Sequence, residues 1–194
     1  MATTLAEATG RSRANQAPNA VTVEEFWQMS QERDIWGDLI EGEIFEMTPP
    51  GLEHGQLSGI ILSLLMNHVR SRKLGMVFDE CGFVMSRNPD TVLAPDVSFI
   101  AAARLPPMIT PQFSEVVPDL AVEVLSPSDT HSCIRDKAER YLAGGVREVW
   151  IVDPRRRVVE IVRPPDHWLS LRGADPIETP LLPGFSVPVA SVFE

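Results

Sequence analysis

Two short apolar runs separated by a helical pattern stand out in the second half of the chain. Residues 119–125 read DLAVEVL, and residues 146–153 read VREVWIVD, which is rich in β-branched residues and Trp. Between them, residues 130–143 have apolar positions at helical spacing and are followed by Gly144 and Gly145. A strand, a helix and a strand of these lengths form a βαβ unit, so we predict two parallel strands that are buried on both faces.

Two carboxylates lie inside apolar runs that we predict to be strands. Glu123 lies in residues 119–125, and Asp96 lies in residues 92–100. A buried charge is costly unless it has a partner, a metal or a shifted pKa. At 100° per residue, Lys137 falls at the edge of the helix's apolar arc, from which it can reach the strands. Two acids and a lysine that converge on one sheet would make a site for a hard divalent cation and a phosphate-like anion. The alternative is a buried Glu–Lys pair that only holds the helix to the sheet.

The rest of the chain predicts an α/β protein with an N-terminal helix and a β-hairpin. We expect residues 1–20 to be a flexible tail and residues 21–194 to form a single domain. A capping-box sequence begins a helix at residues 22–31, and alternation around a Glu-Gly turn predicts a hairpin at residues 35–47. The remaining expected elements are a long helix at 53–74, strands at 76–85, 92–100, 158–162 and 168–171, a proline-rich loop at 101–117 and a docked segment at 182–193.

Composition and charge narrow the class of protein. A chain of 194 residues with 44% hydrophobic content can form one soluble domain with a sizeable core, and its longest apolar stretch, residues 59–66, is too short to span a membrane. The two cysteines make neither a disulfide framework nor a zinc site, so we expect a cytoplasmic protein. A net charge of −10 argues against non-specific DNA binding, which depends on neutralising phosphates.

Several short motifs occur in an order that is similar to that of a known nuclease family. They are LIEGE at 39–43, MTPP at 47–50, HG at 54–55, APDVSFI at 94–100, PDLAVEVLSP at 118–127, Lys137, Tyr141, Gly145-Val146, VWIVDP at 149–154 and LPGF at 182–185. Together they resemble the PD-(D/E)XK nuclease superfamily. Within it they resemble a branch of predicted restriction endonucleases, abundant in cyanobacteria and other bacteria, that was long filed as a domain of unknown function. The resemblance implies a restriction-endonuclease-like fold, in which a mixed central sheet has helices on both faces.

The resemblance also implies roles for individual residues. Asp96 and Glu123 match the two acids that hold Mg²⁺, or Mn²⁺ in its place, and the backbone carbonyl of Val124 would be a further ligand. The lysine of the motif usually stands two positions after the second acid, where this chain has Leu125. In this branch it is placed on the following helix, at the position of Lys137. A four-carbon stem lets the ammonium reach the attacking water or the scissile phosphate from a helix.

Three further residues are candidate accessory groups. Asp38 stands where the family usually has a Glu in the first hairpin strand, and its shorter side chain leaves a metal or water contact from that strand in doubt. His54 matches a family histidine and projects to the inner side of its helix, where it would contact the site or cap the helix. Tyr141 matches a tyrosine four residues after the lysine and lies in the apolar arc. His68, in contrast, is expected to be a satisfied core or subunit-contact histidine.

Three functions are compatible with these residues. The first is a Mg²⁺-dependent endonuclease that hydrolyses phosphodiester bonds of DNA, with Asp96, Glu123 and Lys137 as catalytic residues. The second is a catalytically silent scaffold of nuclease-like fold that binds nucleic acid or a protein partner, which the negative net charge favours. The third is a metal-assisted hydrolase of a smaller phosphoester. Many nucleases of this fold cut paired strands, so we expect a homodimer.

Overall fold

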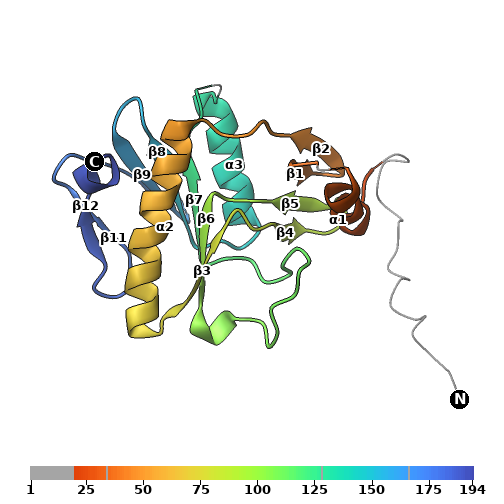
Figure 1. Cartoon of the computed structure of the whole chain (residues 1–194), viewed down its shortest axis with the longest axis horizontal. Coiled ribbons are helices and arrows are strands. Elements are labelled where there is room, and N and C mark those ends of the chain that lie inside the picture. The colour runs from red at the N-terminus through yellow and green to blue at the C-terminus, as the bar shows by residue number, and fades with distance from the viewer. Residues whose placement is uncertain (1–19, 34, 128, 166) are drawn as a thin grey trace, which may run out of the picture.

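A six-stranded mixed sheet is the centre of the computed structural model, which describes residues 20–33, 35–127, 129–165 and 167–194 (Figure 1). The strands lie in the order β10-β9-β8-β7-β6-β3 and span His167–Arg172, Val158–Arg163, Glu148–Asp153, Leu120–Val124, Val97–Ala101 and Gly75–Asp79. β7 and β8 are parallel, and the other neighbouring pairs are antiparallel. The expected tail at 1–20 lies, apart from Ala20, outside the described residues.

The predicted βαβ unit is confirmed. α3 (His131–Ala143) connects β7 to β8, and every residue of both strands is buried. Successive residues of β7 face opposite sides of the sheet. Val122 packs in the core beneath α2 (Leu52–Arg72), and Ala121 packs in the core beneath α3. Figure 1 shows α2 crossing in front of the central sheet, so the expected mixed sheet with helices on both faces is present.

A second sheet of four strands carries the N-terminal hairpin. Its order is β2-β1-β5-β4, and its strands span Glu43–Glu46, Gly37–Ile40, Thr91–Leu93 and Phe83–Ser86. β1 and β2 form the predicted hairpin, and both turn residues, Glu41 and Gly42, have positive φ, as a two-residue hairpin turn requires. α1 (Val23–Glu32) begins at Thr22 with the predicted capping box, and its Phe26 is buried against this sheet. Hairpin and helix are therefore confirmed.

Two predicted strands, at residues 76–85 and 92–100, are wrong, because each is two strands that belong to different sheets. The chain leaves the central sheet between β3 and β4 and returns to it between β5 and β6. Pro95, at the return, has no N–H group with which to continue a ladder of hydrogen bonds. Asp96 therefore lies in the bend between the two sheets and not inside a strand.

The C-terminal segment is docked under α2, as predicted. β11 (Pro176–Glu178) pairs with β12 (Ser186–Pro188), and the short helix η2 (Val189–Val192) follows. His68 Nε2 lies 3.2 Å from the carbonyl oxygen of Pro183, so this histidine is satisfied within the fold, as expected. The predicted loop at 101–117 begins with a 3-10 helix, η1 (Ala102–Arg104). Over the described ranges, no helix is both long and apolar enough to cross a membrane.

Candidate active site

Where the two sheets meet, polar side chains from three elements form a buried cluster. Asp38 comes from β1 of the second sheet, Glu123 from β7 of the central sheet, and Lys137 and Tyr141 from α3. Lys137 Nζ lies 3.1 Å from Asp38 Oδ2 and 3.0 Å from Glu123 Oε1. The hydroxyl of Tyr141 donates a hydrogen bond of 2.6 Å to Glu123. Positions four apart on a helix share a face, which is why Lys137 and Tyr141 reach the same carboxylate.

Asp38 takes part in this cluster despite its short side chain. One of its oxygens contacts Lys137, and the other accepts the N–H of Ala94 at 3.0 Å. Ala94 directly precedes Pro95 in the bend between the sheets. Asp38 therefore ties the hairpin both to α3 and to the segment that carries Asp96.

Asp96 lies beside the cluster and is paired with His54. Asp96 Oδ2 accepts the N–H of Val124 at 2.6 Å, and Asp96 Oδ1 lies 3.3 Å from His54 Nε2. His54 is in the first turn of α2 and points to the site, which was one of the two positions expected for it. Its Nδ1 is buried and has no hydrogen-bond partner within the described part of the chain. The hydrogen bond to Asp96 raises the pKa of His54 against the opposing effect of burial.

Glu123 and Lys137 are strongly coupled electrostatically. Burial raises the pKa of Glu123 to about 7; Lys137 lowers it, while the charges of Asp96 and Asp38 raise it further. Burial opposes the charge on Lys137, but Glu123 and Asp38 outweigh it and raise the pKa of the lysine. Asp96 bonds the backbone of Val124, the residue after Glu123, so the two predicted acids are close enough for their charges to repel each other.

This coupling predicts a pH dependence of stability. The folded pKa of Glu123 is about 7 and its ordinary value is 4.5, so the folded state binds this proton more tightly. The resulting stabilisation is complete below pH 4.5 and is lost as the pH rises through 7, with a total of roughly 1–3 kcal/mol. Urea unfolding in EDTA at pH 5 and pH 8 measures it. Glu123→Gln should reduce the difference in unfolding free energy between pH 5 and pH 8, whereas Glu139→Gln on the exposed face of α3 should keep it. The same pH dependence in both variants would contradict the assignment of this effect to Glu123.

The structure adds one acid that the sequence analysis missed. Glu80 follows β3 where the chain leaves the central sheet, and its N–H donates to the carbonyl oxygen of Asp96 at 3.2 Å. Burial raises the pKa of its carboxyl group, and the charges of Asp79 and Asp96 add to this effect. In the sequence, this acid could have been found because Asp79 and Glu80 stand together at the end of an apolar run, directly before Cys81 and Gly82.

The fold and this cluster define the class of protein. The central sheet is mixed and has helices on both faces. One acid directly precedes a core strand, a second lies on the neighbouring strand, and a lysine reaches this second acid from the following helix. This is the arrangement of a restriction-endonuclease-like protein of the PD-(D/E)XK superfamily.

Comparison with known proteins gives the family. The model of the Uma2 family, described as "Putative restriction endonuclease", matches residues 23–190. The chain belongs to this family. In a crystal structure, a "putative nuclease belonging to DUF820" from Anabaena variabilis ATCC 29413 has a similar fold, with a TM-score of 0.77 and 21% sequence identity over 89% of this chain and 97% of that chain. A search of curated proteins gives no match.

Proposed function

We propose that the chain is an endonuclease that hydrolyses phosphodiester bonds of DNA with the help of Mg²⁺, or of Mn²⁺ in its place. Membership of a family described as "Putative restriction endonuclease" supports a nuclease. One observation carries the proposal. Lys137 Nζ lies 3.0 Å from Glu123, while Asp96 is near enough to raise the pKa of that carboxyl group. An ammonium beside two acids suits a reaction in which negative charge builds on a phosphate.

Asp96, Glu123 and the backbone carbonyl of Val124 would hold the cation. Mg²⁺ binds through one or two carboxylates and keeps several waters, which fits two acids that repel each other. In the described ranges, no group of three or more His, Cys, Asp or Glu side chains is placed to hold a metal ion, so the proposed set is two carboxylates and one carbonyl, with water. When bound, the cation supplies Lewis-acid polarisation of the phosphate and lowers the pKa of water.

The side chains around these acids supply charge and orientation. The ammonium of Lys137 would stabilise the hydroxide or the charge that develops on the scissile phosphate. Asp38, 3.1 Å away, holds that ammonium from the side of the hairpin. Tyr141 fixes the carboxylate of Glu123 through its 2.6 Å hydrogen bond. His54 is a positioning residue, because it contacts Asp96 through Nε2.

A specific observation favours a catalytically silent scaffold as the second candidate. Both oxygens of Glu123 already have partners, since Lys137 contacts each of them and Tyr141 donates to one. A carboxylate satisfied in this way serves as a structural link between α3 and the sheet. The net charge of −10 also weakens attraction to DNA.

Metal binding and DNA cleavage together separate the two candidates. Mg²⁺ and Mn²⁺ are titrated by calorimetry into the wild type and into Asp96→Ala/Glu123→Ala, and the same samples are incubated with plasmid and with single-stranded DNA. Asp136→Ala/Glu139→Ala, which removes two exposed acids of α3, is the control of equal charge. Metal binding and cleavage by the wild type and the control alone support the nuclease. No metal binding by the wild type rejects it in favour of the scaffold. Binding without DNA cleavage directs attention to a smaller phosphodiester, tested with bis(p-nitrophenyl) phosphate.

A further inference from the structure

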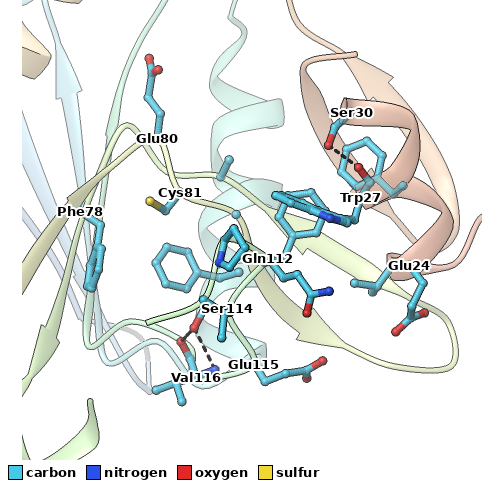
Figure 2. A pocket seen from close by; sticks show the side chains of 18 of the residues that line it. Glu24, Trp27, Ser30, Phe78, Glu80, Cys81, Gln112, Ser114, Glu115 and Val116 are labelled. Carbon is cyan, nitrogen blue, oxygen red and sulfur yellow. Dashed lines mark hydrogen bonds between the residues drawn. The ribbon is translucent and has the colours of Figure 1, made fainter. Parts of the chain in front are cut away.

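A pocket of about 840 Å³ borders the proposed active site. Its walls come from α1, from the crossing between β3 and β4, and from the loop at 101–117. In Figure 2, Phe78 and Trp27 lie on opposite sides of the pocket. Glu80 lines its edge, with the carboxylate directed away from Phe78, and the backbone N–H of Glu80 donates to the backbone carbonyl oxygen of Asp96. The pocket and Asp96 are therefore linked through Glu80, which lines the one and bonds the backbone of the other.

Aromatic rings form one wall of the pocket. Trp27 meets Phe113 edge-on at 5.1 Å between ring centroids, and Phe113 stacks on Phe26 at 5.4 Å. The backbone at Gly82 approaches this wall so closely that a Cβ atom there would lie 2.4 Å from the ring of Phe113. The three rings thus pack on one another and on the backbone of Gly82, and they make this side of the pocket apolar.

Three large apolar side chains of the pocket are exposed to solvent. Trp36 is 51%, Met108 71% and Ile109 56% exposed, and all three line the pocket. Exposed aromatic and thioether groups beside a concave surface are typical of sites that receive a flat ligand. Amide groups that can bond the edge of such a ligand come from Gln28, Gln31 and Gln112.

The charges of the pocket disfavour a phosphate and suit a neutral ring. Among the described residues that line it, Arg87 is the one cation, and it is engaged by Glu24, Asp90 and Glu115. Three acids of the lining, Glu24, Glu80 and Glu115, outnumber this one cation, so a phosphate placed here would meet net negative charge. The amino groups of a nucleobase, in contrast, can donate to carboxylates and amides.

We propose that this pocket binds an unpaired nucleobase of the strand whose phosphate lies at Asp96 and Glu123. The inference rests on the proposed nuclease function. It adds that the substrate is a strand in which one base is unstacked from its neighbours. Proteins hold such bases against aromatic side chains and bond their edges, and the volume lies in the range of about 300–1,000 Å³ that ligand sites occupy. Asp96 and Glu123 would bind the phosphate backbone of the strand through the cation, while the pocket binds the base.

Binding of two matched strands tests the proposal. One is a fluorescent single-stranded octanucleotide, and the other has the same backbone but no bases; fluorescence anisotropy is measured with Ca²⁺ in place of Mg²⁺. The wild type should bind the strand with bases roughly 5- to 150-fold more tightly, which is the range that base–aromatic stacking contributes. Trp36→Ala and Met108→Glu should remove most of this preference. Leu169→Ala and Leu169→Glu on β10, where the side chain is also exposed, should leave it unchanged.

The outcomes separate this inference from the nuclease proposal. Equal affinity of the wild type for the two strands, binding of neither strand, or a preference that survives both pocket variants would overturn the base pocket. Metal binding to Asp96 and Glu123 is measured by calorimetry on the same variants, and the pocket substitutions should leave it unchanged. Pocket variants that lose the binding of an apolar peptide while keeping the preference for bases would assign the pocket to a protein partner and overturn the proposal.

Discussion

Replacing Lys137 with methionine is expected to lower the free energy of unfolding by about 3–5 kcal/mol at pH 7.5, the cost of removing one partner of a buried ion pair. The side chain of Lys137 is 17% exposed, and its ammonium contacts Asp38 at 3.1 Å and Glu123 at 3.0 Å. Without it, two carboxylates remain close together away from water. Urea unfolding measures the loss. At pH 5 the loss should be smaller, because Glu123, whose pKa burial raises to about 7, then takes up a proton.

Two further variants test the cause of this destabilisation. Lys137→Met combined with Asp38→Asn and Glu123→Gln should recover most of the stability, because neutral side chains need no counter-charge. Arg140→Met, three residues further along α3, removes a cation whose bond to Glu41 is at the surface, and it should cost no more than about 1 kcal/mol. A triple variant as unstable as Lys137→Met alone would show that packing of the lysine stem, and not its charge, is lost.

Asp96→Asn is expected to reduce Mg²⁺-dependent cleavage at least about a thousandfold, which corresponds to roughly 4 kcal/mol of transition-state stabilisation. The amide keeps the shape of the side chain and can still accept the N–H of Val124, which now bonds Asp96 Oδ2 at 2.6 Å. The fold should therefore be retained, while the charge that would hold the cation is lost. Initial cleavage rates at saturating Mg²⁺, with thermal melting as a check of folding, measure the effect.

The matched control for this variant is Asp136→Asn. Asp136 is exposed on α3 next to Lys137, so its substitution changes the net charge by the same amount without altering the cluster. It should cleave at the wild-type rate. Activity of Asp96→Asn within tenfold of the wild type would remove Asp96 from the proposed metal site and would favour the scaffold.

The hydrophobic pattern predicted the elements whose burial is regular, and it failed where the chain passes between two sheets. β7, α3 and β8 show their periods because both faces of the strands and one face of the helix are buried. The run at 92–100 stays apolar although it passes from one sheet to the other, because β5 is buried in the second sheet and β6 is buried in the central sheet. Pro95 was the one residue of that run that marked the break.

Only those contacts of the cluster that depend on a single helix or strand could be predicted from the sequence. The apolar arc of α3 placed Lys137 at its edge, and the structure puts its ammonium beside Glu123. The link from Lys137 to Asp38 depends on how the second sheet packs against the first, which no local pattern encodes. The same holds for His54, which meets Asp96 because the start of α2 comes next to the bend between the sheets.

The bridge made by Lys137 also bears on how the chain acquires its site during folding. Lys137 and Glu123 are 14 residues apart, so their contact forms with the βαβ unit. Lys137 and Asp38 are as far apart in sequence as Arg140 and Glu41, which is 99 residues, and closing so long a loop is entropically costly and slow. The cluster is complete only when the N-terminal hairpin has joined the central sheet. Metal binding or cleavage would then report on complete folding of the chain. A fragment that lacks the hairpin would keep the central sheet but would lack Asp38, the second carboxylate that contacts Lys137.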